Sequence, residues 1–333
     1  MKRKKLITFC LVASLLMFFL LELSINEVWC AEEKYPSRTI EMICGFAPGG
    51  QDDLTTRVLA KAFERYFKVP AVVTNKAGGA QLIAATALAN AVPDGYTLAH
   101  LGDVSLVTHI LLKRATFTIE DFTVIGEMDQ EPPTLVVSAE SPWKRIDEFI
   151  DYARKNPDLG FGHPGVGSSP HLRGEYFNKL AKTNMKGVPF KGDSECIVAV
   201  LGKHIPMAVL SFASAKAQEK AGKMRILFAF DYAGEDRFDP TIPNIPSFFG
   251  KDVFNIGPVS DYLVAPGKLP ENIVNILTQA MVQIPKEDKE YIDALKPLYI
   301  GTTFIDGKTW MSKIRPQKTL QIQRLLQEVG VLK

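Results

Sequence analysis

The sequence predicts an α/β fold, because strand, turn and helix follow one another repeatedly along the chain. Residues 38–46 are rich in β-branched and apolar side chains and end in a glycine turn. They lead into residues 53–67, where apolar positions recur on one helical face. The same succession recurs at 71–91 and from residue 96 onward. Strands that alternate with helices favour a parallel sheet, so we expect an α/β protein.

The chain beyond residue 120 continues this alternation. Residues 240–258 are rich in proline and are expected to be irregular. Further strands are expected at 122–128, 135–137, from 159, 188–191, 207–212, 225–231 and 261–265, and further helices at 146–155, 170–181, 194–202, 270–283 and 313–330.

The N-terminus has the three-part plan of a secretory signal. Four basic residues at 2–5 precede an apolar run at 6–21, and Val28-Trp-Cys-Ala31 offers a cleavage site after Cys30. We expect residues 1–30 to be a signal peptide and the mature protein to be exported. Two alternatives stay open, a lipid anchor at Cys30 and an uncleaved membrane anchor. The run is shorter than the roughly 20 apolar residues that a spanning helix needs.

Removal of residues 1–30 leaves a neutral chain of 303 residues. Taking away four of 39 basic and two of 37 acidic residues leaves 35 of each sign. No nucleic-acid partner is therefore expected, and the length suggests two domains. Cys44 and Cys196 stand among apolar residues and are expected to be buried thiols without a disulfide.

Two strands run into glycine turns that open helices, Phe46–Gly50 and Gly162–Ser169. A helix start presents backbone N–H groups without internal partners and carries partial positive charge. Two such starts that face one cleft would hold an anion from both sides. Ser169 is expected to cap the second helix, with Pro170 as its first residue.

The chain shows no motif of an enzyme. Ser168 and His171 lie close in sequence, but no G-x-S-x-G elbow is present. The histidines lack H-x-H or H-E-x-x-H spacing, so no metal or cofactor is expected. A serine hydrolase that uses Ser168 and His171 remains the enzymatic alternative.

An ordered set of short motifs resembles the Bug family, the substrate-binding proteins of tripartite tricarboxylate transporters. The motifs span essentially the whole mature chain. They are Tyr35-Pro-Ser-Arg38, Phe46-Ala-Pro-Gly-Gly50, Asn75-Lys-Ala-Gly78, Pro93-Asp-Gly-Tyr-Thr97, Gly165-Val-Gly-Ser168, Val188-Pro-Phe-Lys-Gly192, Lys220-Ala-Gly-Lys223 and Glu328-Val-Gly-Val-Leu-Lys333.

The resemblance implies a two-lobed periplasmic binding protein of type II, the Venus-flytrap kind, with two crossover strands near 130–137 and 253–260. Lobe one would be residues 35–132 plus 257–333, and lobe two residues 133–256. A monomer would capture a small carboxylate between the lobes and deliver it to the permease subunits of the transporter. A periplasmic sensor of the same fold is the alternative.

The resemblance also implies the ligand contacts. His171 either donates to a carboxylate or packs against its turn, and Lys191 is either a pocket charge or an exposed lysine. Ser211 is the one polar side chain of its strand. The expected contacts are Phe46, Ala47, Pro48, Gly49, Gly50 and Asp53 from lobe one, and Gly165, Gly167, Ser168, Ser169, His171, Lys191, Gly192 and Ser211 from lobe two.

Asp52 and Asp103 depart from the small polar residues that are usual in the family. Either they serve helix starts and solvent, or one of them lines the cleft and binds a positive group. The second interpretation predicts an amino-acid-like ligand, and for this reason Asp103 is included among the candidate contacts.

Overall fold

A computed structural model describes residues 34–230, 241–254, 256–257, 259–300 and 304–332. The chain divides into two units, Met1–Ser37 and Arg38–Lys333. The expected signal peptide at 1–30 and Asp231, the end of one expected strand, lie outside the described residues. All elements below belong to the second unit.

The first sheet has five strands in the order β2-β1-β3-β10-β4. β1 pairs in parallel with β2 and β3, whereas β10 runs antiparallel to both β3 and β4. Four of the five strands therefore share one direction, and the expectation of a parallel sheet is wrong for β10, which runs against its two neighbours. The strands are β1 (Ile40–Cys44), β2 (Ala71–Asn75), β3 (Thr97–Gly102), β4 (Phe122–Glu131) and β10 (Val259–Pro266).

The second sheet repeats this plan in the order β7-β6-β8-β5-β9. β6 pairs in parallel with β7 and β8, and β5 runs antiparallel to β8 and β9. The strands are β5 (Pro133–Ser138), β6 (Gly160–His163), β7 (Lys186–Pro189), β8 (Met207–Ser211) and β9 (Met224–Ala229).

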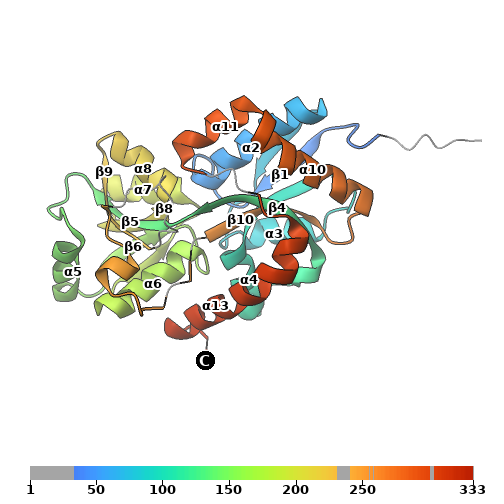
Figure 1. The fold of residues 1–333 in the computed structure, drawn as a ribbon. Helices are drawn as coiled ribbons and strands as arrows, with labels where there is room; N and C mark the ends of the chain where they lie inside the picture. Colours follow the sequence, from blue (N-terminus) through green and yellow to red (C-terminus); the bar gives the residue numbers. More distant parts are fainter. Residues whose placement is uncertain (1–33, 231–240, 255, 258, 301–303, 333) are drawn as a thin grey trace, which may run out of the picture. The chain divides into compact units, whose positions relative to one another are not determined.

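The chain passes from the first sheet to the second between β4 and β5, and returns between β9 and β10. Figure 1 shows β4 and β5 as one long green path that crosses from one sheet into the other. This double crossing gives the α/β, two-lobed architecture that the sequence resemblance implied. The exact lobe boundaries stay a prediction.

Helices follow most strands, and several begin directly where a strand ends. The main helices are α2 (Gln51–Phe67), α3 (Leu82–Ala89), α4 (Asp103–Leu111), α5 (Ile146–Lys155), α6 (Ser169–Ala181), α7 (Asp193–Leu201), α8 (Phe212–Lys220), α10 (Glu271–Glu287), α11 (Lys289–Leu295) and α13 (Arg315–Glu328), with the short α9 (Ile245–Phe248) and α12 (Gly307–Thr309).

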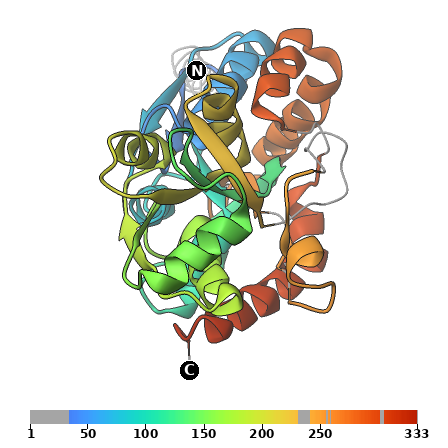
Figure 2. The ribbon, with the colours of Figure 1, turned by 90° about the vertical axis from the view of Figure 1, so that its left-hand side faces the viewer.

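The C-terminal helix α13 joins the core of the second sheet. Its buried residues Ile322, Leu325 and Leu326 belong to one apolar cluster with Phe161 and Phe177. α13 also contacts α4 and α6, and Figure 2 shows it in red below the green helices of the second sheet. This helix therefore follows the strands of the first sheet but packs against both lobes.

The structure corrects two local predictions and confirms a third. The apolar run at 207–212 was predicted to be all strand, but β8 ends at Ser211 and α8 begins at Phe212. Part of the proline-rich stretch is helical, as α9. Cys44 and Cys196 are buried free thiols, which confirms the expectation.

Candidate functional site

The first turns of five helices converge on one cavity between the two sheets. α2 and α4 follow strands of the first sheet, and α6, α7 and α8 follow strands of the second. The cavity encloses about 40 Å³ of free space, enough for a few water molecules. Its lining residues are Phe46, Asp52, Gln81, Gly102, Ser105, Pro133, Pro164, Ser169, Pro170, Asp193, Ser211, Val259 and Asp261.

The turn between β1 and α2 is held in shape by Asp53. The Asp53 carboxylate accepts hydrogen bonds from Gly49 N–H (3.0 Å) and Asn75 Nδ2 (2.8 Å), and pairs with Arg57 at 2.9 Å. Burial opposes ionisation of Asp53, but the bonds from Arg57, Gly49 and Asn75 outweigh it and lower the pKa of this carboxyl. Asp53 does not line the cavity; its role here is to shape the turn.

Residues 46–50 contact the second lobe through their backbone. Ala47 N–H donates to the Lys191 carbonyl at 3.0 Å, and Ser194 Oγ donates to the Pro48 carbonyl at 2.9 Å. Gly192 packs so closely that an added Cβ would lie 3.0 Å from Ala47 N. The backbone of Lys191 and Gly192 therefore holds the lobes together, and among residues 46–50 only Phe46 lines the cavity.

The second glycine turn is also an inter-lobe contact. Gly165 has φ +121°, and an added Cβ would lie 2.8 Å from Ala80 N in the first lobe. Gly167, with φ +100°, donates its N–H to His171 Nδ1 at 3.2 Å. The His171 ring packs at a tilt of 47° against the His163 ring, with centroids 4.4 Å apart, and His171 does not line the cavity. These contacts agree with the packing alternative for His171.

The cap of α6 was predicted one residue too late. Ser168 is the N-cap, and its Oγ accepts from the His171 backbone N–H at 3.3 Å. Ser169 begins the helix, lines the cavity and accepts a hydrogen bond from Arg173. The error arose because two serines precede Pro170, and only the tertiary structure selects between them. The Ser168 hydroxyl meets the backbone of His171 and not its imidazole, so this pair lacks the geometry of a nucleophile and its base.

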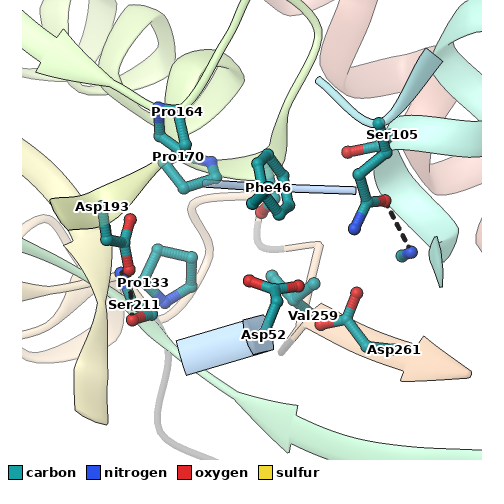
Figure 3. A pocket seen from close by; sticks show the side chains of 13 residues that line it. Phe46, Asp52, Ser105, Pro133, Pro164, Pro170, Asp193, Ser211, Val259 and Asp261 are labelled. Atoms are coloured by element: carbon teal, nitrogen blue, oxygen red, sulfur yellow. Dashed lines mark hydrogen bonds between the residues drawn. The ribbon is translucent and has the colours of Figure 1, made fainter. Parts of the chain in front are cut away.

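Carboxylates dominate the cavity wall, which the sequence only partly indicated. Figure 3 shows Asp52 and Asp261 close together on one side and Asp193 beside Ser211 on the other. Asp193 accepts hydrogen bonds from the Ser211 hydroxyl and, at 3.2 Å, from the Ser211 N–H. Burial, with a further contribution from Asp193, raises the pKa of Asp52 to about 7.

Asp103 lies behind the wall and not on it. It is buried at the start of α4, with its carboxylate 3.7 Å from Lys318 Nζ of α13. Burial raises the pKa of Asp103, although Lys318 opposes this effect. Of the two acids that the sequence singled out, the one that lines the cavity is Asp52.

Sequence reasoning missed several lining residues. Gln81 Oε1 accepts a hydrogen bond from the Gly102 N–H at 2.8 Å, and Asp261 is the third residue of β10. An aspartate at the start of a buried apolar strand was the available signal for Asp261. The other missed residues are Gly102, Ser105, Pro133, Pro164, Pro170 and Val259.

Two mixed sheets, two chain crossings and a cavity lined from both sheets define a two-lobed periplasmic binding protein. The chain belongs to the tripartite tricarboxylate transporter receptor family, whose sequence model matches residues 55–329. It is thus a solute-binding protein of a periplasmic family, as the sequence motifs indicated.

Bacterial relatives agree with this assignment. A UPF0065 protein from the gbd 5′ region of Cupriavidus necator is 31% identical over 249 residues, which cover 74% of this chain and 75% of that protein. BugT of Bordetella pertussis is 27% identical over 250 residues, 73% of this chain and 75% of BugT. The periplasmic binding protein BugD has the same fold, with a TM-score of 0.79 at 23% identity over 90% of this chain and all of BugD.

Proposed function

We propose that this protein captures a small organic acid between its lobes and delivers it to the membrane subunits of a tripartite tricarboxylate transporter. The observation that carries the proposal is the convergence of five helix N-termini on one cavity, two from the first lobe and three from the second. The partial positive charge at the start of each helix favours a carboxylate there.

The inter-lobe contacts support capture by closure. Turn 46–50 meets the loop at 191–194, and Gly165 meets Ala80. The free space of about 40 Å³ between the lobes would hold a few water molecules, so we expect the lobes to separate when a ligand enters. A ligand that touches both lobes then stabilises the closed state alone, and this difference in binding free energy drives closure.

Two proteins with this fold support the ligand class. A protein of R. palustris was solved with adipate, with a TM-score of 0.81 at 21% identity over 89% of this chain and 98% of that protein. MatC of Rhodopseudomonas palustris was solved with bound malate, with a TM-score of 0.76 at 22% identity over 89% of this chain and the whole of MatC. We extend small dicarboxylates to this chain as the first ligands to test.

The cellular site is proposed from the N-terminus. Residues 1–30 act as a cleaved signal peptide that releases the protein into the periplasm, with a lipid at Cys30 as the alternative. Within the described residues, no helix combines the length and the apolar character needed to cross a bilayer.

Isothermal titration of the mature protein with succinate, malate and adipate tests the ligand class. We expect one ligand per chain and thermal stabilisation that grows with concentration, by about 2.7 kcal/mol at a hundredfold excess over Kd. Ser105→Leu places a larger apolar side chain in the cavity and should abolish the response. Ser312→Leu, on an exposed serine, is the matched control. If no dicarboxylate binds the wild-type chain, or if Ser105→Leu binds normally, the proposal is wrong.

A further inference from the structure

Four side chains from four elements gather beside the cavity. They are Asp52 of α2, His100 of β3, Asp129 of β4 and Asp261 of β10. His100 Nε2 lies 3.7 Å from Asp52 Oδ1, 3.9 Å from Asp129 Oδ2 and 3.9 Å from Asp261 Oδ1. The side chains of His100 and Asp129 are 0% and 1% exposed, whereas those of Asp52 and Asp261 are 21% and 11% exposed and line the cavity.

Hydrogen bonds fix the tautomer of His100. The Thr56 hydroxyl donates its one proton to the Asp52 carbonyl at 2.6 Å. Thr56 Oγ1 and the same carbonyl lie 2.9 and 3.2 Å from His100 Nδ1. A carbonyl only accepts, so both contacts require the ring proton on Nδ1. In the neutral ring, Nε2 then carries a lone pair and no hydrogen. This resembles the arrangement of a metal-binding histidine, whose other nitrogen donates to a carbonyl or similar group.

The cluster contains acceptors that face other acceptors. His100 Nε2 and both carboxylate oxygens of Asp129 are buried and have no hydrogen-bond partner. Among the described residues, no lysine or arginine forms an ion pair with Asp52 or Asp129. Buried carboxylates that share a site repel one another and are costly to leave unpaired. A bound cation would supply the partner that His100 Nε2 and the Asp129 carboxylate lack.

We propose that Asp52, His100, Asp129 and Asp261 bind a divalent metal ion. Ligand atoms about 2.1 Å from a tetrahedral ion stand roughly 3.4 Å apart, so the 3.7–3.9 Å from His100 Nε2 to the three carboxylates must shrink by a few tenths of an ångström. The ligand atoms of Asp52, His100 and Asp261 all lie within 4.8 Å of one another, and Asp129 joins this group through its 3.9 Å contact with His100. An ammonium group with bonds of about 2.8 Å would need acceptors roughly 4.6 Å apart, a larger change in the opposite direction. The distances therefore favour a metal ion over the amino group of a ligand.

The donor set indicates which metal. Mg²⁺ and Ca²⁺ prefer oxygen ligands alone, whereas imidazole suits Zn²⁺ and other transition metals, and carboxylates suit Mn²⁺. Three carboxylates with one imidazole nitrogen therefore fit Mn²⁺ or Zn²⁺. Asp52 and Asp261 place the ion at the cavity wall. If the proposed function holds, the ion offers a coordination position to the carboxylate of the organic acid, which the acidic wall would otherwise repel.

Titration of the chelator-treated mature protein with MnCl₂ alone, and with ZnCl₂ alone, tests the site. We expect one ion per chain. Asp129→Asn and His100→Gln should weaken binding at least about tenfold. Glu175→Gln is the control, because Glu175 is a partly buried acid of α6 that accepts a hydrogen bond from Asn178 and does not line the cavity; it should retain the wild-type affinity. Without metal, Asp129→Asn should be at least as stable as the wild type, which shows that it folds.

Three results would overturn the proposal. The first is no binding of either metal, and the second is equal binding by wild type and Asp129→Asn. The third is stabilisation by aspartate but not succinate in the presence of chelator, lost in Asp129→Asn, which would assign the cluster to a ligand ammonium group. Titration of dicarboxylates with and without Mn²⁺ separates this test from that of the proposed function, because metal binding is measured first in the absence of any acid.

Discussion

Gly192→Ala should weaken ligand binding while the two lobes stay folded. Gly192 has φ 170°, an extended backbone that alanine adopts without strain. The added methyl group would lie 3.0 Å from Ala47 N and 3.2 Å from Ala47 Cβ in the opposite lobe. It therefore opposes closure and not the folding of either lobe.

The size of this effect follows from the contact. Overpacking by one methyl group costs about 1–3 kcal/mol, and separation of the lobes also weakens the 3.0 Å bond from Ala47 N–H to the Lys191 carbonyl. Because only the closed state has this contact, the loss appears in ligand affinity. A cost of about 1–3 kcal/mol corresponds to a roughly 5- to 150-fold increase in Kd.

Calorimetric titration measures the ligand affinity, with the dicarboxylate that stabilises the wild type most. Thermal denaturation of the ligand-free variant measures whether its lobes stay folded. Gly50→Ala is the control, because its methyl group would meet Asp193 of the other lobe at an ordinary 3.6 Å. We expect this variant to bind nearly as the wild type does. Unchanged affinity in Gly192→Ala, or an equal loss in both variants, would refute the assignment of this contact to closure.

Two further predictions concern the buried ionisable side chains His163 and Asp103. Burial, followed by repulsion from His171, lowers the pKa of His163 from 6.5 to about 3. Below pH 6.5 the unfolded chain therefore binds a proton at His163 that the folded chain does not bind, and the free energy of unfolding decreases. By about pH 5 the loss is about 2 kcal/mol. Urea denaturation of the wild type and of His163→Gln across this range should show a smaller pH dependence of stability in the variant. Lys318→Met should cost about 3 kcal/mol, because it leaves Asp103 buried without its partner at 3.7 Å. Adding Asp103→Asn should recover most of that loss, and a double variant no more stable than Lys318→Met would contradict the pairing.

Local sequence patterns predicted the elements that depend on local forces. The helix at Ile146–Lys155 has the predicted bounds, because its apolar positions recur on one face and Asn156-Pro157 ends it. The glycines of both turns mark places where backbones approach closely, and Gly165 and Gly167 have positive φ. Apolar surroundings sufficed to predict two buried thiols.

The sequence alone therefore determined the alternation of strands and helices, the two glycine turns and, through its motifs, the family. Tertiary structure decided the direction of β5 and β10, since antiparallel pairing depends on distant strands and leaves no local period. It also decided the acidic cluster, whose members are separated by up to 209 positions between Asp52 and Asp261. No spacing rule finds such a set, because α2, β3, β4 and β10 bring the four side chains together only after the sheet has formed.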